Sequence, residues 1–74
     1  MMKRDPQVLV GQAIRARRLA LGLSQDHFAD AIGMHRAYYS SLERGVRNLT
    51  INTLLKVAEG LGVTGSQILE DAKL

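Results

Sequence analysis

Apolar residues recur along most of this chain at spacings of three and four positions, the period of an amphipathic helix. The first such segment runs from about Pro6 to Leu21, and proline suits the first turn of a helix. Val10, Ile14, Arg18 and Leu21 follow one face of this segment. No segment alternates apolar and polar residues for long enough to predict a strand, so the pattern indicates an all-helical protein.

The central part of the chain predicts two short helices joined by a tight turn. Ser24 offers an N-cap oxygen for a helix that stops at Gly33, and a further helix is expected from about His35 to Arg44. The crossing of two such helices needs a small residue, which Ala29 supplies. The turn needs a residue that tolerates positive φ, which Gly33 supplies. Six positions agree with a helix-turn-helix over about residues 24–45: Gln25, Ala29, Gly33, Tyr39, Leu42 and Glu43.

The last part of the chain predicts two more helices. Thr50 caps a fourth helix that ends before Gly62. Thr64 and Gln67 form a capping box for a short fifth helix. We therefore expect a single all-α domain of five helices, covering residues 1–74.

Composition narrows the chemistry that this domain can perform. The 74 residues include no cysteine, and His27 and His35 stand eight positions apart without a carboxylate cluster, so both are expected at the surface and no metal or cofactor is expected. Neither a nucleophile–base constellation nor a glycine-rich phosphate loop is present, and we expect no enzyme. The net charge of +3, concentrated before residue 48, favours an acidic partner such as nucleic acid. The chain lacks an apolar run of membrane-spanning length, so a cytoplasmic location is expected.

The sequence resembles the Cro/C1-type (XRE-like) helix-turn-helix family of phage repressors and bacterial transcriptional regulators. The likeness rests on GLSQ at 22–25, SSLERG at 40–45 and LLKVAEGLGV at 54–63, and it covers roughly residues 12–69. Residues 35–50 also resemble the controller proteins of restriction–modification systems, with an Arg-x-Tyr start and an Arg-Asn loop. The resemblance implies a five-helix, lambda-repressor-like domain that binds double-stranded DNA with its third helix in the major groove.

The resemblance also assigns roles to individual residues. If Tyr39 and Leu42 face inward, a helical wheel leaves much of the third helix facing outward. The residues expected to read bases are Arg36, Ala37, Ser40 and Ser41, with Arg36 the foremost because a guanidinium can bond guanine with two hydrogen bonds. The residues expected to contact the DNA backbone are Gln25, Tyr38, Arg44, Arg47 and Asn48. Arg18 and Glu43 are expected to form a structural ion pair.

One recognition helix reads only a few base pairs, so we expect a homodimer on a palindromic operator, regulating its own promoter. The dimer surface is expected in the C-terminal segment at Val63, Ile68, Leu69 and Leu74, with packing of these residues in the core as the alternative. No second domain that could sense a small-molecule ligand is evident. Two other functions remain open: the antitoxin of a toxin–antitoxin pair, and a protein-interaction module that has lost DNA binding.

Overall fold

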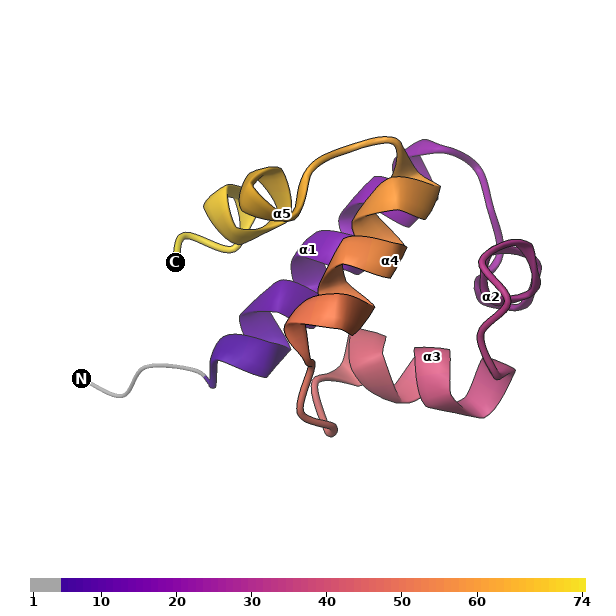
Figure 1. Cartoon of the computed structure of the whole chain (residues 1–74), viewed down its shortest axis with the longest axis horizontal. Coiled ribbons are helices and arrows are strands. Elements are labelled where there is room, and N and C mark those ends of the chain that lie inside the picture. The colour runs from indigo at the N-terminus through magenta and orange to yellow at the C-terminus, as the bar shows by residue number, and fades with distance from the viewer. Residues whose placement is uncertain (1–4) are drawn as a thin grey trace.

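A computed structural model describes residues 5–74 as five helices and no strand, which confirms the predicted all-α fold (Figure 1). The helices are α1 (Pro6–Ala20), α2 (Gln25–Ala31), α3 (Arg36–Arg44), α4 (Ile51–Leu61) and α5 (Gly65–Asp71). The expected domain began at residue 1, and its first four residues lie outside the described part. No helix within residues 5–74 is both long and apolar enough to span a bilayer.

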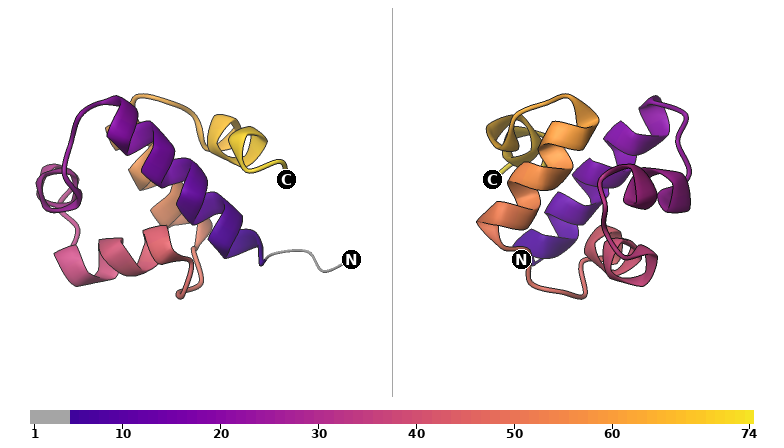
Figure 2. Two further views of the ribbon diagram at one scale, coloured as in Figure 1. Left: turned by 180° about the vertical axis from the view of Figure 1, so that it is seen from behind. Right: turned by 45° about the vertical axis from the view of Figure 1, so that its right-hand side comes forward.

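Helix α1 is the centre of the arrangement. It packs against α3, α4 and α5, while α2 packs against α3 (Figures 1 and 2). Consequently α2 and α3 lie on one side of the α1–α4 pair, and α5 lies on the other. The α2–α3 unit therefore packs on α1 through α3, and α5 packs on another side of α1.

The helix ends follow the local sequence closely. The side chains of Ser24, Thr50 and Thr64 each accept a hydrogen bond from a backbone N–H in the first turn of α2, α4 and α5. The capping box of Thr64 with Gln67 is complete, as predicted. Only His35, before α3, gives no side-chain cap among these four.

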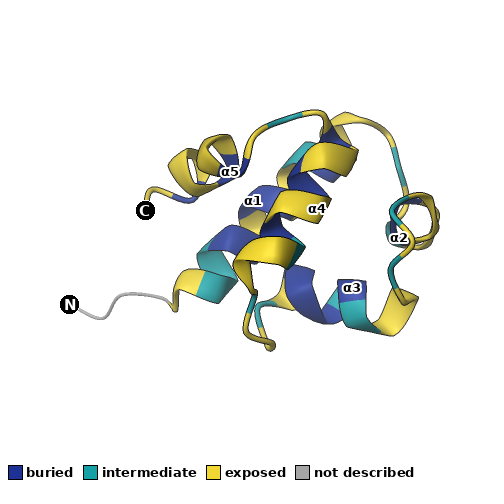
Figure 3. Ribbon diagram, viewed as in Figure 1, coloured by how far each residue is buried: buried dark blue, intermediate teal, exposed yellow. Residues whose placement is uncertain are grey.

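The core lies where α1, α4 and the α2–α3 unit meet (Figure 3). Phe28 of α2 and Tyr39 of α3 meet edge to face, with ring centroids 5.3 Å apart, a favourable aromatic geometry. Ile14 of α1, Val57 of α4 and Ile68 of α5 are also fully buried. Val10, Ile14 and Arg18 share a buried face of α1 as the spacing predicted, but Leu21, placed on the same face, follows the last turn of α1 and is 52% exposed.

Helix α1 approaches α3 very closely at Gly11. A β-carbon at this position would lie 2.5 Å from the backbone carbonyl oxygens of both Leu42 and Glu43. Only glycine leaves room for this approach. The end of α3 is therefore fixed against the first half of α1 by direct backbone contact.

Candidate nucleic-acid interface

The turn between α2 and α3 has the geometry that the sequence predicted. Gly33 has φ of +66°, and Ala29 is fully buried where the two helices approach. The backbone N–H of Met34 donates to the carbonyl of Ala29 at 2.8 Å, which closes the turn. α2 and α3 thus form a helix-turn-helix whose second helix carries the candidate base-reading residues.

Most of the candidate base-reading residues lie on the surface of α3. Arg36 and Ala37 are exposed and Ser40 is half-buried. Ser41 is different: it is 5% exposed, and its hydroxyl donates to the carbonyl of Tyr38 at 2.5 Å. The predicted outward position of Ser41 was therefore wrong, because this side chain is buried and its hydroxyl is satisfied within α3.

Arg36 is engaged by two carboxylates of α2. Its Nε and Nη2 donate to the two carboxylate oxygens of Asp30 at 3.1 and 2.7 Å, and its Nη1 lies 3.4 Å from Asp26. The hydrogen bond with Asp30 raises the pKa of Arg36, and the same bond lowers the pKa of Asp30. All three side chains are more than half exposed, so a DNA duplex could reach them.

Three of the candidate backbone-contact residues form a second group, at the end of α3 and in the loop after it. Arg44, Arg47 and Asn48 are exposed. The Arg47 guanidinium lies over the ring of Tyr38, 5.7 Å from its centroid, so these two side chains share one surface. The amide oxygen of Asn48 accepts a hydrogen bond from Gln7 of α1 at 3.1 Å, which ties the loop to the start of that helix.

Gln25 has a role that sequence reasoning missed. Its amide nitrogen donates to Glu43 at 2.8 Å, so the side chain points into the domain. The expectation of a side-chain phosphate contact came from the family resemblance and gave Gln25 no partner within the domain. The structure instead uses it to link the start of α2 to the end of α3.

Glu43 is the centre of a buried polar network. Arg18 binds it through two hydrogen bonds of 2.6 and 3.0 Å, forming the expected ion pair. The hydroxyl of Tyr39 also donates to this carboxylate. Burial opposes ionisation of Glu43, but hydrogen bonds from Arg18, Tyr39 and Gln25 outweigh it and hold the pKa of Glu43 below its usual range. Burial, followed by the hydrogen bond to Glu43, raises the pKa of Tyr39.

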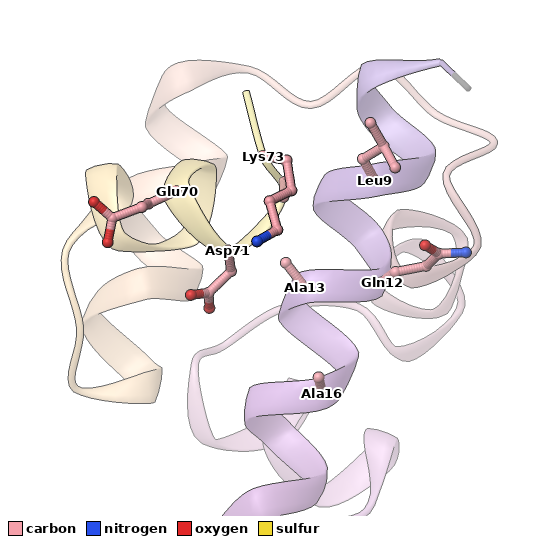
Figure 4. A pocket seen from close by; sticks show the side chains of 8 residues that line it. Leu9, Gln12, Ala13, Ala16, Glu70, Asp71 and Lys73 are labelled. Atoms are coloured by element: carbon pink, nitrogen blue, oxygen red, sulfur yellow. The ribbon is translucent and has the colours of Figure 1, made fainter. Parts of the chain in front are cut away.

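A hollow of about 670 Å³ lies between α1 and the C-terminal residues (Figure 4). Its lining includes Gln12, Ala13, Ala16, Glu70 and Lys73, and none of its residues belongs to α2 or α3. Nearby, Arg17 and Asp71 form a partly exposed ion pair with an Nε–Oδ2 distance of 2.5 Å. No group of three or more potential metal ligands occurs within residues 5–74.

The face shared by α4 and α5 carries exposed apolar side chains. Ile51 is 74% exposed and Leu55 is 52% exposed; Leu69 and Leu74 are 37% and 58% exposed. Ile51, Leu69 and Leu74 line one hollow of about 370 Å³. Sequence reasoning missed Ile51 and Leu55, although their spacing of four residues puts them on one side of α4.

Two of the four residues expected at a dimer surface fit this face. Leu69 and Leu74 are exposed there, whereas Val63 is half-buried and packs on the core. The expectation for Ile68 was wrong, because this side chain is fully buried among the core residues. The alternative, core packing, holds for Ile68.

The family described as Helix-turn-helix matches residues 14–68, which include the α2–α3 unit and all of the buried polar network. The chain belongs to the Cro/C1-type helix-turn-helix family. It is a DNA-binding transcriptional regulator of this family.

The chain is similar over most of its length to controller proteins. It is 42% identical to the control protein C.MunI of Mycoplasma sp, over 90% of this chain and 92% of that protein. It is 34% identical to the control protein C.BamHI of Bacillus amyloliquefaciens, over 93% and 86%. Among solved structures, the restriction-modification controller protein C.AhdI from Aeromonas hydrophila matches with a TM-score of 0.80 and 37% identity, over 84% of this chain and 94% of that one.

The clp gene regulator ClgR from C. glutamicum has the same fold, with a TM-score of 0.91 and 27% identity over 96% of this chain and 92% of that one. These relatives are regulators rather than enzymes. They favour neither the antitoxin nor the interaction module among the alternatives.

Proposed function

We propose that this protein is the controller of a restriction–modification system, and that it binds a palindromic operator as a homodimer to regulate its own promoter. The observation that carries the proposal is the surface of α3, where an exposed arginine at the first turn is followed by a basic loop. The similarity to the controller proteins C.MunI and C.AhdI supports the choice of this class among regulators.

In this proposal the two groups of the interface have different tasks. Arg36, Ala37 and Ser40 read base edges in the major groove. Arg44, Arg47 and Asn48 follow the phosphate backbone from the end of α3 and the loop after it, and Tyr38 joins them through its contact with Arg47. Gln25 and Ser41 are left out of both groups, because Ser41 is buried and Gln25 donates to the buried carboxylate of Glu43.

The homodimer uses the apolar face of α4 and α5, made by Ile51, Leu55, Leu69 and Leu74. A small domain that exposes several large apolar side chains on one face gains stability by covering them with a second copy. Two recognition helices then stand about one turn of DNA apart, roughly 34 Å, and each reads one half-site.

In vitro selection from a random duplex library tests the DNA-binding part of this proposal. We expect an enriched palindrome, and a matching site upstream of the gene that encodes this chain. A reporter driven by that upstream region should respond to the protein. Failure to enrich any sequence contradicts operator binding, and an enriched site found only at other promoters contradicts autoregulation.

Sedimentation velocity with Leu55→Lys tests the dimer. Leu21→Lys is a matched control, because Leu21 and Leu55 are both 52% exposed and only Leu55 lies on the proposed face. We expect Leu55→Lys to be monomeric at concentrations where the unaltered protein and Leu21→Lys are dimeric. Equal dimerisation of all three proteins contradicts the assignment of this face.

A further inference from the structure

The pair between Arg36 and Asp30 uses only one edge of the guanidinium. A guanidinium carries five N–H donors in a fixed plane. Nε and Nη2 share one edge, and Asp30 accepts from both, at 3.1 and 2.7 Å. The opposite edge, formed by Nη1 and the second proton of Nη2, therefore keeps two parallel donors.

That second edge has the shape required for guanine. Two parallel N–H donors match the O6 and N7 acceptors that guanine presents in the major groove. Asp30 thus does not compete for the edge that would read the base. Asp30 lies in the last turn of α2, and Arg36 is the first residue of α3. Figure 1 shows that only a short turn joins these two helix ends.

We propose that Asp30 is a positioning residue for base recognition, which holds the Arg36 guanidinium so that its free edge faces the DNA. The proposal rests on the proposed function, in which Arg36 reads a base. An arginine side chain has several freely rotating bonds, and fixing its plane before binding lowers the entropy lost on contact with the correct base. A carboxylate beside the groove also repels phosphates, which weakens binding to DNA where no guanine compensates.

Asp26 provides a contrast within the same helix. It contacts Nη1 alone, at 3.4 Å, whereas Asp30 accepts two shorter hydrogen bonds from one edge of the guanidinium. A single long contact does not fix the plane of the guanidinium as two parallel bonds do. Both aspartates are exposed and carry the same charge near the same arginine, so they differ mainly in how firmly they orient it.

The test compares affinity for the selected operator duplex with affinity for a scrambled duplex of equal composition. The variants are Asp30→Ala, Asp26→Ala, Arg36→Ala and the double variant Arg36→Ala with Asp30→Ala. We expect Arg36→Ala to lower the ratio of the two affinities by about tenfold or more, as for one bidentate guanine contact. Asp30→Ala should lower the ratio by roughly threefold, because it removes orientation but keeps the guanidinium.

Asp26→Ala should bind both duplexes more tightly and keep the ratio. In the Arg36→Ala background, Asp30→Ala should leave the ratio unchanged, since there is no guanidinium left to orient. A role in stability alone would not produce this dependence on Arg36, and matched thermal unfolding curves would verify that all variants are folded.

The outcomes separate the two proposals. If Arg36→Ala keeps the ratio, or if no operator is selected, base reading by Arg36 fails and the role of Asp30 fails with it. If Arg36→Ala lowers the ratio but Asp30→Ala does not, only the role of Asp30 is overturned. It is also overturned if Asp26→Ala and Asp30→Ala change the ratio equally, because the effect would then be one of charge.

Discussion

Arg18 of α1 and Glu43 of α3 form an ion pair whose side chains are only 6% and 1% exposed. Replacing Arg18 with methionine would leave a buried carboxylate without its cation. Loss of one partner of a buried pair costs about 3–5 kcal/mol, so we expect Arg18→Met to lose a large part of the free energy of unfolding. Urea denaturation measures this loss. Arg15→Met, on the exposed side of the same helix, is the control and should change stability little.

Acid should destabilise the protein through the same carboxylate. Since the pKa of Glu43 is lowered in the folded state, its contribution to stability is complete above its ordinary value of about 4.5 and is lost as the pH falls below that value. Asp30 and Asp71, whose pKa values are also lowered by hydrogen bonds from arginines, act in the same direction. We expect Glu43→Gln to be less stable at pH 7 and to lose less stability than the unaltered protein on going to pH 3, as thermal unfolding can measure. Parallel losses in the two proteins would show that Glu43 does not carry this dependence.

Glycine at position 11 should be required even though the position is helical. In an unobstructed helix, Gly→Ala is stabilising by up to about 1 kcal/mol. Here the added carbon would meet two backbone carbonyl oxygens at 2.5 Å, so α1 and α3 must move apart. Overpacking of this kind costs about 1–3 kcal/mol, and we expect Gly11→Ala to be destabilising in urea titrations. A stabilising Gly11→Ala would contradict the close approach, with Gln12→Ala, at the exposed neighbouring position, as the reference.

The helices were predictable from sequence because their signals are local. Ser24, Thr50 and Thr64 are each followed directly by the helix that they cap, and the periodic apolar positions lie within one segment. The pair of Arg18 with Glu43 was predictable only because a family resemblance brought together two residues 25 positions apart.

Pairings between distant or equally plausible side chains were not predictable. Arg17 and Asp71 are separated by 54 positions, and no periodicity relates them. Ser41 was assigned to the surface because a wheel drawn for one helix does not show where its neighbours pack. Ile68 was assigned to a dimer surface, with core packing as the alternative, because the sequence does not show that α5 packs against α1. Whether Arg36 forms hydrogen bonds with Asp30 depends on the angle between α2 and α3. The sequence predicts the turn between these helices but not this angle with the accuracy that a hydrogen bond requires.

Arg36→Ala and Arg47→Ala should weaken DNA binding in different ways. Loss of a base contact lowers affinity for the operator by about 1–3 kcal/mol more than it lowers affinity for scrambled DNA. Loss of a phosphate contact weakens binding to both duplexes alike and reduces the slope of log K against log salt by roughly one. Fluorescence anisotropy titrations at several salt concentrations distinguish these patterns. Equal effects of the two substitutions on both duplexes would contradict the division into base and backbone contacts.

The return of α5 to α1 has a consequence for the synthesis of the protein. Ile68 and Ala72 complete a core whose other members come from the first four helices, and Asp71 binds Arg17 near the end of the first. Before α5 has been synthesised, the side of α1 that α5 covers is exposed to solvent. The core beneath α3 then lacks Ile68 and Ala72. Since a domain generally folds as one unit, the helix-turn-helix reaches its full packing only after α5 has emerged from the ribosome.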